Sequence, residues 1–106
     1  GARLDGAPLD GASLVEASLD RASLDGASLV GIKGYRNSHD IFCEIVRRQK
    51  VEVFVDAEWG AIAQIVINRL CWDTIKKRFA DVMPHIFEIL AKAGFTEWLD
   101  YWSSSK

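Results

Sequence analysis

The chain has 106 residues, of which 49% are hydrophobic and 26% are charged, and its formal net charge is −2. This near-neutral balance argues against a general affinity for nucleic acid, and no run approaches the roughly 18 consecutive apolar residues that a membrane-spanning helix needs. The two cysteines, Cys43 and Cys71, are isolated, which is typical of a reducing compartment rather than a disulfide scaffold, so we expect a cytoplasmic protein.

The first third of the chain is an internal repeat. From Ala2 the units are ARLDG, APLDG, ASLVE, ASLDR, ASLDG and ASLVG, a period of five residues. This period matches neither the 3.6-residue turn of a helix nor the two-residue alternation of a strand. A fixed internal period indicates a solenoid, in which each unit forms one side of a coil.

Two positions of each unit are predicted to point into the coil. Alanine stands first and leucine third, so the two side chains lie on the same side of a short extended segment. Glycine ends four of the six units, where it permits the sharp turn at a corner. The predicted solenoid interior consists of Ala2, Leu4, Ala7, Leu9, Ala12, Leu14, Ala17, Leu19, Ala22, Leu24, Ala27 and Leu29.

These A-x-L-x-x units resemble the pentapeptide-repeat proteins, and the resemblance covers residues 2–36, about a third of the chain. It implies a right-handed quadrilateral β-helix in which four units make one coil, so that Leu4 stacks over Leu24. Six or seven units then make fewer than two coils. Because Gly34 replaces the inward leucine of a seventh unit, we interpret Ile32–Arg36 as the exit from the solenoid.

The N-terminal end of the predicted solenoid has no evident cap. Solenoid repeats bury their apolar faces only against neighbours, and their ends need covering. The chain starts in mid-pattern at Gly1, and its one methionine is Met83, so we expect a piece of a longer repeat array. Alternatively, the open N-terminal coil associates with a second copy of the chain through its exposed strand edges.

From Asn37 onward the pattern becomes helical, and about five short helices are expected over residues 37–106. The first is predicted over residues 39–48, with Ser38 as its N-cap. Residues 51–55 alternate like a strand, but no partner strand is visible nearby. We therefore favour an extended linker for this segment.

Capping residues and one apolar segment define the next three predicted helices. Asp56 is expected to cap the second helix, whose segment 61–67 is apolar nearly all round and therefore indicates the most buried helix. Asp73 is expected to cap the third helix. Pro84 suits the first turn of the fourth helix, and Gly94 is a natural C-terminal stop.

The last predicted helix carries Trp98, Tyr101 and Trp102 on one face. Aromatic rings supply much buried area, and tryptophan and tyrosine are also enriched at binding hot spots. We favour docking of this face on the solenoid, with an anchor for a partner as the alternative. The sequence thus predicts two domains: a pentapeptide-repeat solenoid over residues 1–36 and an α-helical domain over residues 37–106 that caps the last coil.

Reactive side chains do not form a recognisable catalytic or metal-binding motif. His39 and Cys43 lie four residues apart, and Cys71 and His85 follow, but these spacings match no zinc motif. His39 stands beside Asp40, yet adjacent residues at a helix start point in different directions. Because phosphate loops and cofactor fingerprints are also missing from the sequence, we expect neither an enzyme nor a cofactor.

Charged residues form two patterns. Basic clusters at residues 47–50 and 76–78 are interspersed with acidic residues, so nucleic-acid binding is not expected. The outward fourth position of four units holds Asp5, Asp10, Asp20 and Asp25. Some pentapeptide-repeat proteins that protect DNA gyrase are understood to mimic DNA with such a row of acidic charge. Here Val15 and Val30 interrupt the row, and fewer than two coils present no rod.

The predicted function is therefore a non-catalytic protein–protein interaction or scaffold module whose partner is a protein. In this interpretation the repeats form a rigid scaffold, and the helical domain stops edge-to-edge growth of the solenoid. The alternative is inhibition or protection of a DNA topoisomerase, such as gyrase, by a longer parent protein. A regular acidic row over many further coils would favour that alternative.

Overall fold

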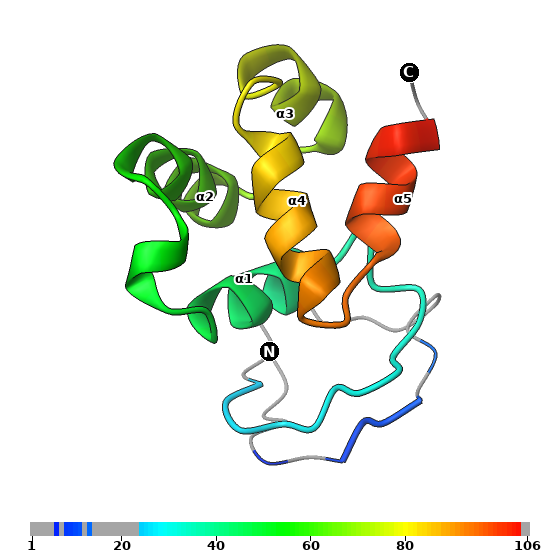
Figure 1. Ribbon diagram of the computed structural model, residues 1–106. Coiled ribbons are helices and arrows are strands. Elements are labelled where there is room, and N and C mark those ends of the chain that lie inside the picture. Colours follow the sequence, from blue (N-terminus) through cyan, green and yellow to red (C-terminus); the bar gives the residue numbers. More distant parts are fainter. Residues whose placement is uncertain (1–5, 7, 12, 14–23, 105–106) are drawn as a thin grey trace. The chain divides into compact units, whose positions relative to one another are not determined.

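The computed structural model describes Gly6, residues 8–11, Ser13 and residues 24–104 (Figure 1). The chain divides into two compact units, Gly1–Arg48 (unit 1) and Gln49–Lys106 (unit 2). The predicted domain boundary after residue 36 marks where the helical sequence begins. The first helix nevertheless groups with the repeats. The boundary between the two compact units therefore falls after Arg48, twelve residues later in the sequence than predicted.

The repeats in unit 1 pair with a step of 20 residues, because parallel bridges join Pro8 to Ser28 and Ser13 to Lys33. Three backbone hydrogen bonds of 2.7–2.8 Å run between the same two coils, from the N–H groups of Gly6, Leu9 and Gly11 to the carbonyls of Asp25, Ser28 and Val30. This is the register expected of a β-helix with four five-residue units in each coil.

Glycine forms the corners of the coil. Gly26 and Gly31 have φ angles of 70° and 71°, in the left-handed region that glycine adopts without steric strain. The Ala27 N–H donates to the Leu24 carbonyl at 2.9 Å and closes a four-residue turn with Gly26 at its third position. A β-carbon on Gly26 would lie 3.8 Å from the backbone nitrogen of Gly6, so corners of successive coils stack closely.

The exit from the solenoid begins at Gly34, two residues later than predicted. Ile32 is buried, and Lys33 pairs with Ser13, so the repeat pattern continues into a seventh unit. Gly34, with a φ of 71°, then turns the chain. Tyr35 is buried although its position in the unit faces outward elsewhere, because the regular coil has ended.

Helix α1 (His39–Arg47) completes unit 1. The Ser38 hydroxyl accepts a hydrogen bond from the Ile41 N–H at 3.1 Å, and Asp40 lies in the first turn, where the helix dipole stabilises a carboxylate. The predicted N-cap is thus confirmed. The predicted apolar stripe is also confirmed, since the buried residues include Ile41, Phe42, Ile45 and Val46.

Unit 2 contains a 3₁₀ turn, η1 (Val51–Val53), and helices α2 (Asp56–Asn68), α3 (Trp72–Arg78), α4 (Met83–Lys92) and α5 (Glu97–Ser104). With α1, the described part of the chain has five α-helices, in agreement with the predicted number. The extended linker predicted over residues 51–55 is wrong at its first three residues, which form η1. The Val53 N–H donates locally to the Lys50 carbonyl at 3.2 Å, and only Phe54 and Val55 are extended.

The N-caps of α2 and α3 differ from the predicted ones. Val55 rather than Asp56 is the N-cap of α2, and Cys71 rather than Asp73 is the N-cap of α3. In both helices the acidic residue lies inside the first turn, where it still interacts favourably with the helix dipole. At α2 the Glu58 carboxylate accepts the Val55 N–H at 2.9 Å, so a side chain of the first turn satisfies this backbone donor.

The two ends of α4 agree with the prediction. Pro84 lies in the first turn, where its missing N–H has no helical acceptor to lose. At the other end Gly94 has a φ of 102°, and the Phe95 N–H donates to the Leu90 carbonyl at 2.9 Å. This is the backbone pairing of a Schellman C-cap.

Helix α4, and not α2, is the most buried helix of unit 2. Ring or polar contacts join α4 to α2, α3 and α5, and Figure 1 draws it among these three helices. Its inner residues Met83, Ile86, Phe87 and Leu90 are fully buried. The prediction for residues 61–67 is therefore wrong: α2 buries one face, whereas Ile67 on the opposite face is 77% exposed.

Candidate interaction surfaces

The structure describes four of the residues predicted to fill the solenoid interior. Leu24, Ala27 and Leu29 are 2–3% exposed, and Leu9 is half-buried. The other predicted interior residues lie outside the described part of the chain: Ala2, Leu4, Ala7, Ala12, Leu14, Ala17, Leu19 and Ala22. Because the described inward side chains form a core, a partner of this region would contact the outward positions and the corners.

Asp10 and Asp25 are the described members of the predicted acidic row, and both are exposed. The Asp10 carboxylate accepts a hydrogen bond from the Ser28 hydroxyl and a second, of 3.2 Å, from the Val30 N–H. Asp10 therefore helps to hold one coil on the next. This structural role accounts for an outward aspartate without any reference to DNA, so the topoisomerase alternative gains no support here.

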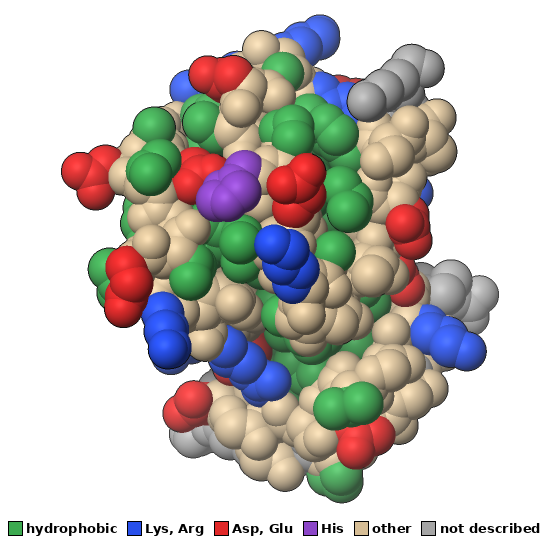
Figure 2. Space-filling view, viewed as in Figure 1, with side chains coloured by type: hydrophobic (Ala, Val, Ile, Leu, Met, Phe, Trp, Pro, Cys, Tyr) green, Lys and Arg blue, Asp and Glu red, His purple; other side chains and the backbone are tan. Residues whose placement is uncertain are grey.

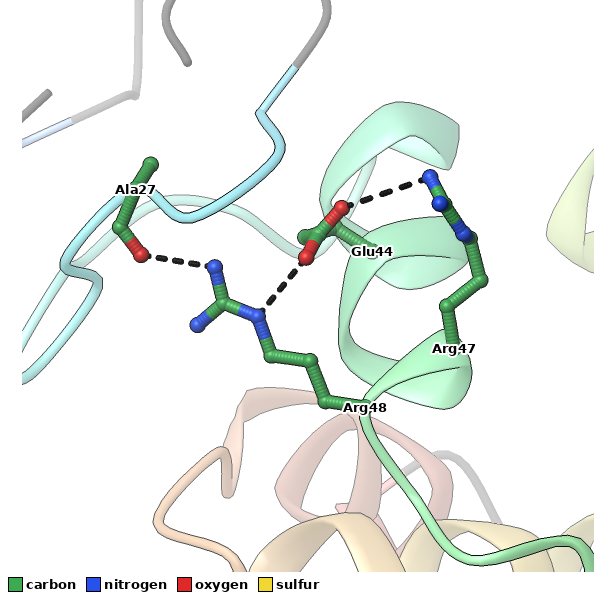
Figure 3. A network of polar contacts seen from close by, with 4 residues as sticks. All are labelled: Ala27, Glu44, Arg47 and Arg48. Atoms are coloured by element: carbon green, nitrogen blue, oxygen red, sulfur yellow. Dashed lines mark hydrogen bonds and ion pairs between the residues drawn. The ribbon is translucent and has the colours of Figure 1, made fainter. Parts of the chain in front are cut away.

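A network of polar contacts joins α1 to the repeats within unit 1 (Figure 3). Arg48 Nη2 donates to the carbonyl of Ala27 at 2.6 Å, while Arg48 Nε donates to Glu44 Oε2 at 2.7 Å. Arg47 Nη1 lies 3.6 Å from the other oxygen, Glu44 Oε1. One buried carboxylate thus orients the guanidinium group that binds the backbone of the repeats.

Burial of the Glu44 carboxylate explains why it has charged hydrogen-bond partners. Glu44 is only 6% exposed, and a buried carboxylate is costly unless charged hydrogen-bond partners compensate its desolvation. Arg48 follows Glu44 by four residues, a spacing that brings the two side chains together on a helix. The neighbouring Arg47 side chain is 63% exposed, whereas the Arg48 side chain is 34% exposed and its guanidinium binds the Ala27 carbonyl.

A second buried carboxylate lies in unit 2, between the starts of α2 and α4. Glu58 is 4% exposed, and its Oε2 lies 2.5 Å from His85 Nδ1, while the His85 side chain is half exposed. The Phe54 ring packs edge-on against the rings of Trp59 and His85, at centroid distances of 5.1 and 6.4 Å. Sequence reasoning missed this pair, because only the fold brings together residues 27 positions apart.

Catalysis by the Glu58–His85 pair would require a further group. A carboxylate and an imidazole need a nucleophile within hydrogen-bond reach, and in the described part of the chain His85 has its hydrogen bond with Glu58. The residues weighed as metal ligands are divided between the units, with His39 and Cys43 in unit 1 and Cys71 in unit 2. Among the described residues, no three His, Cys, Asp or Glu side chains are grouped to hold a metal ion.

Cys71 is an exposed, free thiol at the start of α3. Its Sγ lies 3.3 Å from the Thr74 hydroxyl oxygen. Hydrogen bonding from the Thr74 side chain, and then from the Thr74 backbone, lowers the pKa of the Cys71 thiol from its ordinary value. A larger fraction of this thiol is therefore ionised near neutral pH than in an unstructured peptide.

The aromatic residues of the last helix pack within unit 2. Trp98 is fully buried, whereas Tyr101 and Trp102 are half-buried. The ring of Trp102 lies 5.5 Å from that of Phe87, and the Trp72 ring lies 6.4 Å from that of Tyr101. Through these ring contacts α5 packs against α3 and α4. The docking of this face on the repeats and its alternative role as a partner anchor both stay predictions.

The face drawn in Figure 2 has mixed charge, and a few large apolar residues of the described part of the chain are exposed. On the face drawn in Figure 2, positive and negative side chains are interspersed, and no area carries one sign alone. Four large apolar side chains are strongly exposed, namely Val30, Val51, Val55 and Ile67. No helix in the described part of the chain has the length and apolar character to cross a membrane. A basic stripe of the kind that binds phosphate is not apparent in this view.

The comparison with protein families identifies the repeats. The family model for pentapeptide repeats matches residues 1–33, in eight copies. Neither the curated proteins nor the solved structures contain a match to the chain. The N-terminal residues 1–33 are therefore a pentapeptide-repeat segment, as the A-x-L-x-x units predict.

Proposed function

We propose that this chain is a non-catalytic protein–protein interaction or scaffold module, in which helices cap a pentapeptide-repeat β-helix. The observation that carries the proposal is the network in which Glu44 orients Arg48 toward the carbonyl of Ala27. It ties the first helix to the last described coil within one compact unit. A solenoid end that is covered in this way is protected against edge-to-edge growth.

The geometry of the repeats favours recognition of a protein by surface contact. In a right-handed quadrilateral β-helix, inward alanine and leucine side chains stiffen the coil, and outward positions at fixed spacing face a partner. The outward residues Val30 and Lys33 are both exposed and lie on neighbouring sides of the last coil. Pentapeptide-repeat segments generally serve as protein-interaction modules, which supports the same interpretation.

The remaining features of the proposal concern the partner and the compartment. We expect a protein partner, and the mixed charge of the face drawn in Figure 2 supports this expectation over binding of a polyanion to that face. The cysteines Cys43 and Cys71 are both free, which favours a reducing compartment such as the cytoplasm.

A pull-down from lysate with matched variants tests this function. The repeat-face variant Val30→Glu/Lys33→Glu changes one apolar and one basic side chain of unit 1, both exposed. The control Lys50→Glu/Val51→Glu changes the same residue types in unit 2, also exposed. We expect a stoichiometric partner that the unmodified chain and the control retain and the repeat-face variant loses. Loss of the partner in the control alone would assign the interaction to unit 2. The absence of any partner would contradict the proposal.

A further inference from the structure

The outer face of α2 is an exposed helix surface that the described part of the chain leaves uncovered. It consists of Asp56, Gly60, Ala63 and Ile67, which recur at the helical spacing of four, three and four residues. All four residues are exposed, and Ile67 is 77% exposed. A β-carbon built on Gly60 meets no atom within 4 Å, so the space beside the helix is open.

This face is also uncharged along most of its length. The segment from Trp59 to Asn68 contains no charged residue, although half of the helix surface meets solvent. Helices at a protein surface normally carry charged side chains on the face turned to water. Gly60 and Ala63 at the middle of the face allow the backbone of another helix to approach closely, and Ile67 adds apolar area.

Opposite charges flank the two ends of the outer face. Asp56 begins the helix and is exposed. Toward the other end, Arg78 Nη2 donates to Gln64 Oε1 at 3.1 Å, which places a guanidinium group beside the C-terminal half of α2. Within the described part of the chain, neither Asp56 nor Arg78 forms an ion pair with another residue.

We infer that a second copy of this chain docks on the outer face of α2, with the two helices antiparallel. A two-fold axis midway between Gly60 and Ala63 places each of these residues opposite the other in the partner helix. The same axis brings Asp56 of each copy to the end where the other copy carries Arg78. The arrangement is self-complementary, as an isologous interface must be.

The size of this face sets the expected affinity. Stable protein–protein interfaces bury about 1,200–2,000 Å² in total, and one pair of four-turn helices supplies less than that. We therefore expect a weak dimer with a dissociation constant in the range of about 10–100 µM. Such a dimer goes beyond the proposed function. It would present two copies of the repeat surface, so it could bind a partner bivalently.

Sedimentation equilibrium of the whole chain from about 1 µM to about 1 mM tests the inference. Ala63→Glu places two like charges near the two-fold axis, and we expect it to weaken dimerisation by more than about tenfold. Ala93→Glu is the matched control, because Ala93 is an exposed alanine of unit 2 outside α2, and its dissociation constant should not change. Circular dichroism checks that both variants are folded.

Charge reversal tests the orientation of the pair. Asp56→Arg and Arg78→Asp should each weaken the dimer by several-fold, and the double variant should regain the original dissociation constant because the charges are exchanged. A chain that remains monomeric up to about 1 mM would overturn the inference. A dimer that tolerates Ala63→Glu, or in which the two reversals fail to compensate each other, would overturn it as well.

Discussion

Arg48 binds the backbone carbonyl of Ala27, 21 residues earlier in the chain, through a hydrogen bond of 2.6 Å from Nη2. The guanidinium group is held for this contact by the buried Glu44 carboxylate (Figure 3). A contact to a backbone carbonyl does not depend on the side chain at position 27. Helix α1 is therefore attached to the repeat architecture itself rather than to one particular repeat residue.

The two arginines at the end of α1 should differ in their contribution to stability. Arg48→Ala removes the partner of a buried carboxylate and of the Ala27 carbonyl, so we expect a loss of about 1–3 kcal/mol in the free energy of unfolding. Arg47→Ala removes an ion pair whose arginine is 63% exposed, and its cost should stay below about 0.5 kcal/mol. Urea unfolding followed by circular dichroism measures both, and equal costs would argue against the network.

Two glycines should respond in opposite directions to alanine. Gly26 has a φ of 70° and stacks on Gly6, so Gly26→Ala should destabilise the protein by about 1–2 kcal/mol. Gly60 lies inside α2 with open space around it, so Gly60→Ala should stabilise by about 0.5–1 kcal/mol. Thermal unfolding at low protein concentration compares them. Two shifts of the same sign would contradict the corner geometry or the helix assignment.

Arg69 is the one non-glycine residue with a positive φ, 49°, in the described part of the chain. It ends α2, where the Leu70 N–H donates to the Ile65 carbonyl at 3.2 Å. Arg69→Gly and Arg69→Ala both remove the side chain, but only glycine relieves the left-handed conformation. We expect the glycine variant to be more stable than the alanine variant by about 1 kcal/mol. Urea unfolding monitored by tryptophan fluorescence, which reports on unit 2, decides the comparison.

Cys71 should alkylate faster than an unperturbed thiol at neutral pH. Hydrogen bonding from Thr74 lowers the pKa of the Cys71 thiol, so the midpoint of its pH–rate profile with iodoacetamide should lie below that of a model thiol. Thr74→Val removes the side-chain contribution and should move this midpoint upward. Both profiles are measured in a Cys43→Ser background, which leaves Cys71 as the one reactive cysteine. A midpoint that Thr74→Val leaves in place would show that the hydroxyl is not the cause.

The repeats and the helix ends could be predicted from local sequence rules. The strict five-residue period indicates a solenoid, and the resemblance to pentapeptide-repeat proteins implies its step of 20 residues, which appears as the pairing of Pro8 with Ser28. Ser38 as N-cap and Gly94 as C-terminal stop follow from the hydrogen-bonding and steric properties of single residues. The helix ends depend on interactions between neighbours in sequence, whereas the pairing of the coils follows from the regular repeat.

Features that depend on tertiary contacts were missed. The apolar composition of α2 suggested a fully buried helix, but burial depends on how many helices surround it, and that number cannot be read from one segment. The Arg48–Ala27 and Glu58–His85 contacts join residues 21 and 27 positions apart. Residues 51–53 alternate like a strand, yet without a partner strand the local turn of η1 satisfies their backbone better.

Helix α1 is expected to close the repeats as part of one unit. Native-state hydrogen exchange of the unmodified chain and of Arg48→Ala tests this most directly, with peptides covering residues 24–33, α1 and α4. We predict that Arg48→Ala reduces the protection of residues 24–33 and of α1 together, while α4 keeps its protection. Unchanged protection of residues 24–33 in this variant would contradict the claim that α1 stabilises the end of the solenoid.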